Sequence, residues 1–351
     1  MKFHLVAPPQ TQTTFGYSLD GFTVATINFA RILRMLGHHV ILYGSEETDA
    51  PCNELVTILT KAEQQTLLAG SQYQYAAFDN RYAIWQEANR RTIAAIQSRK
   101  QPRDFICSIG GTAQKEIAEA HPDLMFVEFS IGYIGSFAPY RVYESESWRN
   151  TSQAKQGQIH GRFFDTVIPY FFDAAQFKFN PQKEDFLLYV GRLTPAKGIG
   201  VACKAARAAG LPLKVVGHGD ASLLSDGAEY LGALNNEERG KLMGRARALI
   251  APTQYIEPFG SVVVEAALCG TPAITTDFGA FTETVEQGVT GFRCNYLGEF
   301  VRAAEQAKKL EPVVIRARAV AKYSLEAVAP QYQDYFDRLN LLWGDGWDSL
   351  G

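Results

Sequence analysis

The sequence predicts an α/β protein of two domains, each built on a doubly wound parallel sheet. The chain has 351 residues, which exceeds the ~250–300 residues that one hydrophobic core usually serves. Short apolar runs alternate with helical segments in both halves, a pattern typical of parallel sheets covered by helices on both faces. The alternation pauses at residues 172–182 and then restarts. We therefore expect a linker there, with the strand-to-helix loops of the two domains facing each other across a cleft.

The elements of the first half follow from local patterns. Residues 2–7 are apolar and end before a pair of prolines, which indicates a short strand. Residues 21–36 have apolar side chains at helical spacing and stop at Gly37, a residue favoured just after a helix ends. Further strands are predicted at 39–43, 104–109 and 124–129, with a helix at 113–120.

The second half repeats the same rhythm. Strands are predicted at 186–190, 213–216, 248–251 and 272–275. Helices are predicted at 200–209, 236–247, 260–269 and 281–287. An amphipathic helix is predicted at 324–343. We therefore divide the chain into a first domain at 1–172, a second at 173–323 and a C-terminal segment at 324–351.

Composition narrows the functional classes. The formal net charge is -3, so the bulk charge gives no reason to expect a polyanion-binding protein. The five cysteines are scattered, without a CxxC pair, which favours free thiols in a reducing compartment over disulfides or a metal site. No apolar run approaches the ~20 residues of a membrane span. We expect a cytoplasmic protein without stable membrane insertion.

The most informative segment runs from Glu257 to Glu265. It follows a predicted strand and opens a predicted helix, so Gly260 and Ser261 would offer free backbone N–H groups to an anion such as a diphosphate. Glu265 lies among apolar residues, where a carboxylate without a partner is costly. We interpret it as a hydrogen-bond acceptor for ribose hydroxyls, and Glu257 as a loop carboxylate over the same site.

Two more loops follow strands of the second half. The first runs from Gly191 to Gly198 and carries Arg192 and Lys197, and such cations suit a pyrophosphate. The second contains Gly217 and Gly219, which would allow close backbone approach to a nucleotide. The GxGxxG fingerprint of a dinucleotide-binding first strand is absent from the sequence, which argues against a dehydrogenase.

These motifs together resemble the donor domain of the GT4-like retaining glycosyltransferases, the glycosyl transferases group 1. The resemblance is carried by the ordered strings GRLTPAKG, VVGHGD, YLGALNNEE and APTQYIEPFGSVVVEAALCGTPAITTDFGAFTETVEQGVTGF. It covers residues 166–293. The family implies a GT-B fold, in which two Rossmann-like domains face across a cleft and the C-terminal helix returns to the first domain.

The resemblance also implies an activity and a set of site residues. It implies metal-independent hexosyl transfer with retention of configuration, from a nucleoside-diphosphate sugar (UDP- or GDP-linked) and without a cofactor. Arg192, Lys197 and Glu257 would be the catalytic residues. The donor would contact Gly191, Gly217, Gly219, Phe259, Gly260, Ser261 and Glu265.

The acceptor side departs from the family pattern. Many relatives carry a Gly-Gly loop after the first strand, whereas here only Asp20 and Gly21, with Gly16 earlier, stand in that place. Many also carry a histidine beside the sugar, whereas residues 127–133 have none. We expect Glu128 or Tyr133 to take its place. Arg141 lies in an aromatic stretch, 130–150, that we interpret as a long loop lining the acceptor pocket, with plain packing as the alternative.

The acceptor itself stays open among a glycan, a lipid, a small molecule and a modified nucleic-acid base. A basic stretch at 81–103 would suit anionic lipid or nucleic acid, although a solvated helix face is the reading that we prefer. Two other functions fit the same motifs. One is a sugar-nucleotide epimerase or glycan phosphorylase of the same fold, and the other is a non-catalytic module that binds nucleotide sugars.

Overall fold

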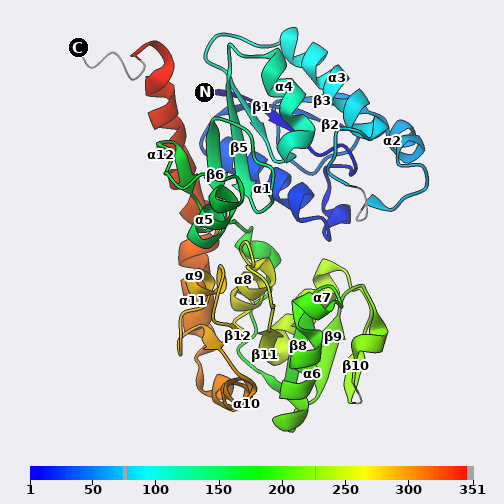
Figure 1. The fold of residues 1–351 in the computed structure, drawn as a ribbon, viewed down its shortest axis with the longest axis vertical. Helices are drawn as coiled ribbons and strands as arrows, with labels where there is room; N and C mark the ends of the chain where they lie inside the picture. The colour runs from blue at the N-terminus through cyan, green and yellow to red at the C-terminus, as the bar shows by residue number, and fades with distance from the viewer. Residues whose placement is uncertain (74–76, 226, 346–351) are drawn as a thin grey trace. The chain divides into compact units, whose positions relative to one another are not determined.

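A computed structural model of the chain describes residues 1–73, 77–225 and 227–345 (Figure 1). The described chain forms two compact units. The first contains Met1–Glu144, Ser152–Phe171 and the segment from Leu325 onward, and the second contains Ser145–Thr151 and Phe172–Ser324. A seven-residue piece of the N-terminal half, Ser145–Thr151, thus belongs to the second unit.

The first unit is built on a seven-stranded, wholly parallel sheet of order β3-β2-β1-β4-β5-β6-β7. Its strands are β1 (Lys2–Val6), β2 (His39–Ser45), β3 (Glu54–Leu59), β4 (Phe105–Ser108), β5 (Met125–Ile131), β6 (Tyr140–Tyr143) and β7 (Asp165–Val167). Its helices are α1 (Gly21–Met35), α2 (Lys61–Leu67), α3 (Ala83–Gln97), α4 (Lys115–Ala120), the end of α5 (Glu146–Lys155) and α12 (Leu325–Asp345).

Helices cover both faces of this sheet. On one face, α3 and α4 bury Trp85 and Ile117 against the strands. On the other face, α1 lies beside α12, and Phe336 of α12 contacts Phe3 and Phe105 edge-on. The C-terminal helix is therefore part of the core of the first unit. Among the described residues, no helix combines the length and the apolar character needed to cross a membrane.

The second unit has a six-stranded parallel sheet of order β10-β9-β8-β11-β12-β13. Its strands are β8 (Glu184–Val190), β9 (Leu213–Val216), β10 (Ala228–Tyr230), β11 (Ala246–Ala251), β12 (Ala273–Thr276) and β13 (Gly291–Cys294). Its helices are α6 (Ile199–Ala208), α7 (Asn236–Arg245), α8 (Ser261–Leu268), α9 (Phe281–Thr284), α10 (Leu297–Gln306) and α11 (Pro312–Tyr323). The apolar cores lie between the sheet and α6 and α10 on one face, and α7, α8 and α9 on the other.

These two doubly wound sheets confirm the predicted fold class. One local prediction is wrong: the stretch 130–150, expected to be a long loop, contains β6 and the first turn of α5. Burial explains the difference. The side chain of Arg141 is buried in the middle of β6, so this strand lacks the apolar run that marks the others.

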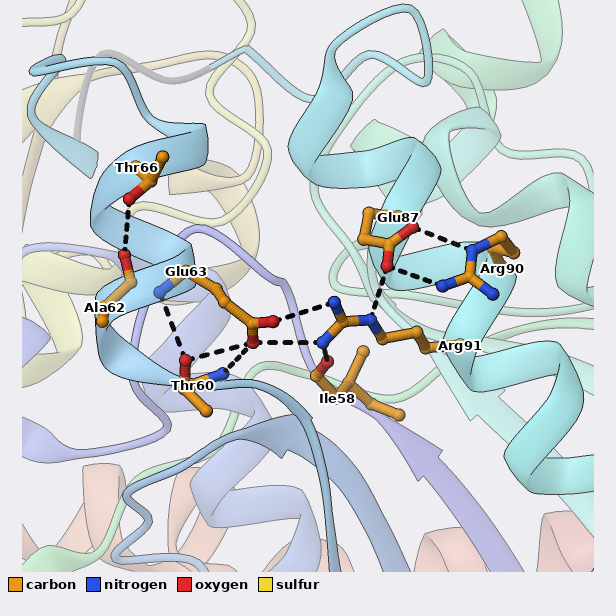
Figure 2. A network of polar contacts seen from close by, with 8 residues as sticks. All are labelled: Ile58, Thr60, Ala62, Glu63, Thr66, Glu87, Arg90 and Arg91. Atoms are coloured by element: carbon orange, nitrogen blue, oxygen red, sulfur yellow. Dashed lines mark hydrogen bonds and ion pairs between the residues drawn. The ribbon is translucent and has the colours of Figure 1, made fainter.

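Five of the six cations in the basic stretch 81–103 pair with carboxylates, and the sixth, Arg103, donates to the Asn340 carbonyl (2.7 Å). Arg91 of α3 donates from Nη2 to Glu63 Oε1 (2.9 Å) and from Nε to Glu87 Oε1 (2.6 Å), which ties α3 to the start of α2 (Figure 2). The remaining ion pairs are Arg81–Asp79, Arg90–Glu87, Arg99–Glu54 and Lys100–Asp123. Because these five cations each have an acidic partner, the stretch presents little net positive charge to an anionic surface.

We expect Arg91→Ala to lower the melting temperature by roughly 2–4 °C at pH 7. Its hydrogen bonds hold the pKa of Glu63 at about 2, below the ordinary 4.5, with help from the backbone of Thr60. Arg90 and Arg91 together hold that of Glu87 at about 2. A carboxyl whose pKa is depressed by folding stabilises the fold above its unfolded pKa, and this contribution is lost as pH falls.

The difference in melting temperature between wild type and Arg91→Ala should therefore be full at pH 7 and shrink below about pH 4.5. The comparison variant is Arg90→Ala, which removes hydrogen bonds to Glu87 alone and leaves Glu63 paired, so its difference should be smaller than that of Arg91→Ala at pH 7. Thermal melts of the three proteins from pH 7 to pH 3 measure this. A difference that stays constant over that range would contradict the prediction.

Candidate functional site

The loop between β8 and α6 carries Lys197 and is fixed by its own turn. The side chain of Thr194 accepts a hydrogen bond from Lys197 N and caps the short 3-10 helix Pro195–Lys197. Gly198 follows with φ of +76°, a left-handed conformation that other residues adopt only at a cost. A Cβ on Gly198 would lie 1.9 Å from the carbonyl oxygen of Pro252. The β8–α6 and β11–α8 loops therefore touch backbone to backbone.

This contact brings the predicted Lys197 and Glu257 together. Lys197 Nζ lies 2.7 Å from Glu257 Oε2, and the two side chains are 18% and 12% exposed. Burial alone would lower the pKa of Lys197, but the Glu257 carboxylate and the Tyr255 hydroxyl outweigh it, so the pKa is raised. The ammonium also lies over the Tyr255 ring, 5.0 Å from its centroid. Lys197 is therefore a fixed cation at neutral pH.

The N-terminus of α8 opens beside this pair. Its N-cap residue, Gly260, has φ of +82°, and no side chain among the described residues caps the helix. A Cβ on Gly260 would lie 2.6 Å from the Phe281 ring, so only glycine fits here. A hollow is lined by Lys197, Glu257 and Gly260 together with Tyr189, Val190, Ala251, Thr253, Val262, Val263 and Phe281. Ser261, the first residue of α8, follows Gly260 directly. Phe259 is buried, with its ring against Tyr323.

Tyr189, which the sequence analysis did not identify, binds the backbone of the β8–α6 loop. Its hydroxyl donates to the carbonyl of Arg192 (2.9 Å) and lies 3.4 Å from that of Lys197. Its side chain is buried at the end of β8. Tyr189 thus fixes the backbone on both sides of the basic loop. No sequence signal identifies it, because a tyrosine near the end of an apolar strand is ordinary.

Arg192 and Glu265 stand outside the lining of the hollow. Arg192 is exposed, and within the described ranges no carboxylate pairs with it. Glu265 pairs with Arg239 of α7, whose Nη2 lies 3.1 Å from Glu265 Oε2. The partner that a carboxylate in an apolar helix needs is therefore an arginine of the neighbouring helix. A contact of Glu265 with ribose stays a prediction.

The glycines of the β9 loop serve a contact between loops. A Cβ on Gly217 would lie 2.0 Å from the carbonyl oxygen of Gly191, and one on Gly219 would lie 2.5 Å from that of Leu193. Leu193 N also donates to the carbonyl of His218 (2.7 Å). The two glycines thus allow the backbones of the β9 loop and the β8–α6 loop to approach closely. Whether a nucleotide contacts these glycines as well stays a prediction.

The predicted acceptor-side residues lie in the first unit, and several are buried there. Glu128 is fully buried; its Oε2 accepts from Phe137 N and Ala138 N (both 2.7 Å) and its Oε1 from the Tyr133 hydroxyl (3.0 Å). Burial raises the pKa of Glu128 against the effect of these hydrogen bonds. Arg141 is also buried and donates to the Ala138 carbonyl (2.7 Å). Glu128 and Arg141 thus shape the segment after β5.

Asp20 caps the first helix of the first unit. Its Oδ1 accepts from Phe22 N (3.0 Å) and Thr23 N (3.1 Å) at the start of α1. Burial raises the pKa of Asp20, although these hydrogen bonds oppose the shift. Gly16 and Gly21 are exposed on either side of it. Their contact with an acceptor or a sugar stays a prediction.

Residues 172–316 match the family model described as glycosyl transferases group 1. A curated relative, the glycogen synthase of Mycobacterium tuberculosis (strain CDC 1551 / Oshkosh), is 36% identical over 177 residues, which cover 44% of this chain and 42% of the relative. The matched region thus spans less than half of that protein. The family-model match at residues 172–316 includes both the Lys197 and the Glu257 loops.

Solved structures match over almost the whole length. AviGT4, a glycosyltransferase involved in avilamycin A biosynthesis, superposes with a TM-score of 0.69 at 22% identity, covering 97% of this chain and 98% of that one. Anabaena Alr3699/HepE in complex with UDP-glucose superposes with a TM-score of 0.63 at 18% identity, covering 96% of this chain and 100% of that one. Residues 172–316 are thus similar to the glycosyl transferases group 1 family, and the chain has the GT-B fold.

Proposed function

We propose that this protein is a glycosyltransferase that moves a hexose from a UDP- or GDP-linked donor to an acceptor hydroxyl with retention of configuration. The observation that carries the proposal is the meeting of Lys197, Glu257 and the uncapped N-terminus of α8 at one hollow of the second unit. The UDP-glucose complex of a structural neighbour supports the donor class. The family match supports the reaction class.

The chemistry follows from where charge develops. When the bond between sugar and diphosphate breaks, negative charge builds on the leaving oxygen and the sugar becomes oxocarbenium-like. Cations and helix N–H groups fixed near that oxygen lower the barrier. Lys197, Arg192 and the first amides of α8 have this role in the proposal. Glu257 orients sugar hydroxyls, and Glu265 binds the ribose.

Two further parts of the proposal concern the metal and the acceptor. We propose that the largely buried ammonium of Lys197, together with the guanidinium of Arg192, takes the place of a divalent cation on the diphosphate, so that transfer needs no metal. The acceptor belongs to one of four classes, namely a glycan, a lipid, a small molecule or a modified nucleic-acid base.

A thermal-shift screen of UDP- and GDP-hexoses tests the donor. A ligand at 100 times its Kd stabilises the native state by ~2.7 kcal/mol, so the right donor should raise the melting temperature clearly. The donor that does so is then incubated with an acceptor panel, with and without EDTA, and transfer should survive EDTA. An epimerised donor would indicate an epimerase instead. Binding without turnover would indicate a non-catalytic module, and no binding of any nucleotide sugar would overturn the proposal.

A further inference from the structure

A short excursion of the chain contacts the loop that carries Glu257. Ser145–Thr151 belongs to the second unit although its neighbours in sequence belong to the first. It contains the first turn of α5. The Ser145 hydroxyl donates to the carbonyl of Pro258, the residue next to Glu257, at 2.6 Å. This hydrogen bond is short and is made by a residue that is 1% exposed.

The position of the Ser145 hydroxyl is fixed from its own side as well. Its oxygen accepts a hydrogen bond from Trp148 N (3.0 Å), the usual arrangement at the start of a helix. One oxygen thus caps the start of α5 and donates a hydrogen bond to the Pro258 carbonyl. The loss of the hydroxyl would therefore remove one hydrogen bond from the Pro258 carbonyl and one from Trp148 N.

The carboxylate of Glu283, in α9, also binds the start of α5. Its Oε2 accepts from Glu146 N (3.0 Å) and its Oε1 from Ser147 N (2.9 Å). A carboxylate is favoured there because the N-terminus of a helix carries partial positive charge. Glu283 therefore fixes the first turn of α5 within the second unit.

Hydrogen bonds from α9 and from Ser145 hold the backbone at Glu257 and Pro258. Ala280, at the start of α9, donates from its backbone N to the Glu257 carbonyl (3.1 Å). Ser145 holds the carbonyl of Pro258, and Glu283 links α9 back to the residues after Ser145. The backbone of Glu257 and Pro258 is therefore held at two successive carbonyls, by segments more than a hundred residues apart.

We propose that Ser145 and Glu283 are positioning residues for Glu257, and that the excursion of α5 into the second unit serves this purpose. This inference rests on the proposed function, in which Glu257 orients the donor sugar. The carboxylate of Glu257 has little freedom of its own, because it pairs with Lys197. A shift of its backbone would therefore move both members of the pair away from the sugar.

The test compares kinetics of Ser145→Ala with those of wild type, using the donor found in the screen. Misplacement of a reacting group by ~1 Å can cost about 10²-fold in rate, and we expect kcat to fall ~10-fold because one of two anchors remains. Ser145→Thr keeps the hydroxyl and should rescue kcat. Glu283→Gln should act in the same direction, and it gives a second probe if Ser145→Ala does not fold.

Two controls separate positioning from stability. Thr151→Ala removes a hydroxyl of α5 whose hydrogen bond goes to Ser147 of the same helix, and it should leave kcat unchanged. In the double variant with Glu257→Gln, Ser145→Ala should cost nothing further, because residues that act through one another are not additive. A purely structural role would lower activity by the same factor in both backgrounds.

The outcomes are distinct. A wild-type protein that neither binds nor turns over nucleotide sugars would overturn the proposed function and this inference with it. An active wild type with an unchanged kcat in folded Ser145→Ala and Glu283→Gln would overturn the inference alone. So would a loss that is multiplicative with that of Glu257→Gln. A loss that Ser145→Thr rescues and that vanishes in the Glu257→Gln background would support it.

Discussion

Replacement of Lys197 by alanine should reduce donor turnover ~10²–10³-fold, the usual effect of removing one group that stabilises developing charge in a transition state. The ammonium is a fixed cation because it is largely buried and pairs with Glu257 at 2.7 Å. Its removal also leaves the Glu257 carboxylate without its ion-pair partner in a partly buried place. Both effects lower kcat.

The matched control for this experiment is Lys204→Ala. Lys204 is an exposed lysine of α6, the helix that follows the Lys197 loop. Its loss should leave turnover unchanged. Single-turnover measurements at saturating donor, with melts to show that both variants fold, give the comparison. Wild-type turnover by a folded Lys197→Ala protein would remove Lys197 from the site.

The second large effect is expected from Gly198→Ala, which should destabilise the second unit by ~3 kcal/mol. Alanine at φ of +76° is strained, and its Cβ would lie 1.9 Å from the carbonyl oxygen of Pro252. Neither atom can move away without shifting a backbone. The Lys197 and Glu257 loops would then separate, so activity should fall together with stability.

Gly200→Ala provides a control two residues away. Gly200 lies in the first turn of α6, and nothing lies within 4 Å of the position of its Cβ. Alanine is the better helix former, by ~0.5–1 kcal/mol in a helix interior, so this variant should be neutral or slightly more stable. Urea unfolding of the two variants measures both effects. Equal stability of Gly198→Ala and Gly200→Ala would contradict the clash that the structure predicts.

Much of the second unit could be predicted because its signals are local. The strand at 213–216 has the predicted bounds, and α8 differs from the predicted 260–269 by a residue at each end. Apolar strands, glycine at turns and the spacing from Glu257 to Glu265 are all visible within a few residues of sequence. The meeting of Lys197 with Glu257 also follows, because strands that are neighbours in a parallel sheet bring their carboxyl ends together.

The residues that sequence analysis missed make their decisive contacts at long range. Ser145 contacts Pro258, and Arg239 contacts Glu265 from another helix. The elements β3, β6, β7, β10 and β13 were missed as well, because each has six residues or fewer and several carry charged side chains. For such short strands, pairing with neighbours outweighs the local pattern.

On the acceptor side, sequence analysis named residues but not their surroundings. Sequence analysis placed Glu128 beside the sugar and Arg141 in a loop lining the acceptor pocket, and both side chains are buried within the first unit. Ala138 N donates to Glu128 across the segment between β5 and β6, and Arg141 donates to the Ala138 carbonyl. The local sequence around a polar residue in a strand does not show whether its side chain faces solvent or is buried against a neighbouring segment.

The loops around the Lys197–Glu257 hollow touch through main chain at Gly198, Gly217 and Gly219. At these backbone contacts, which we call seams, glycine has no side chain that a substitution could resize, and any added side chain would clash. Attempts to alter sugar preference by directed evolution will therefore find few tolerated changes at the seams. An adjustable position lies instead at Ile256, which is next to Glu257 and has an exposed side chain.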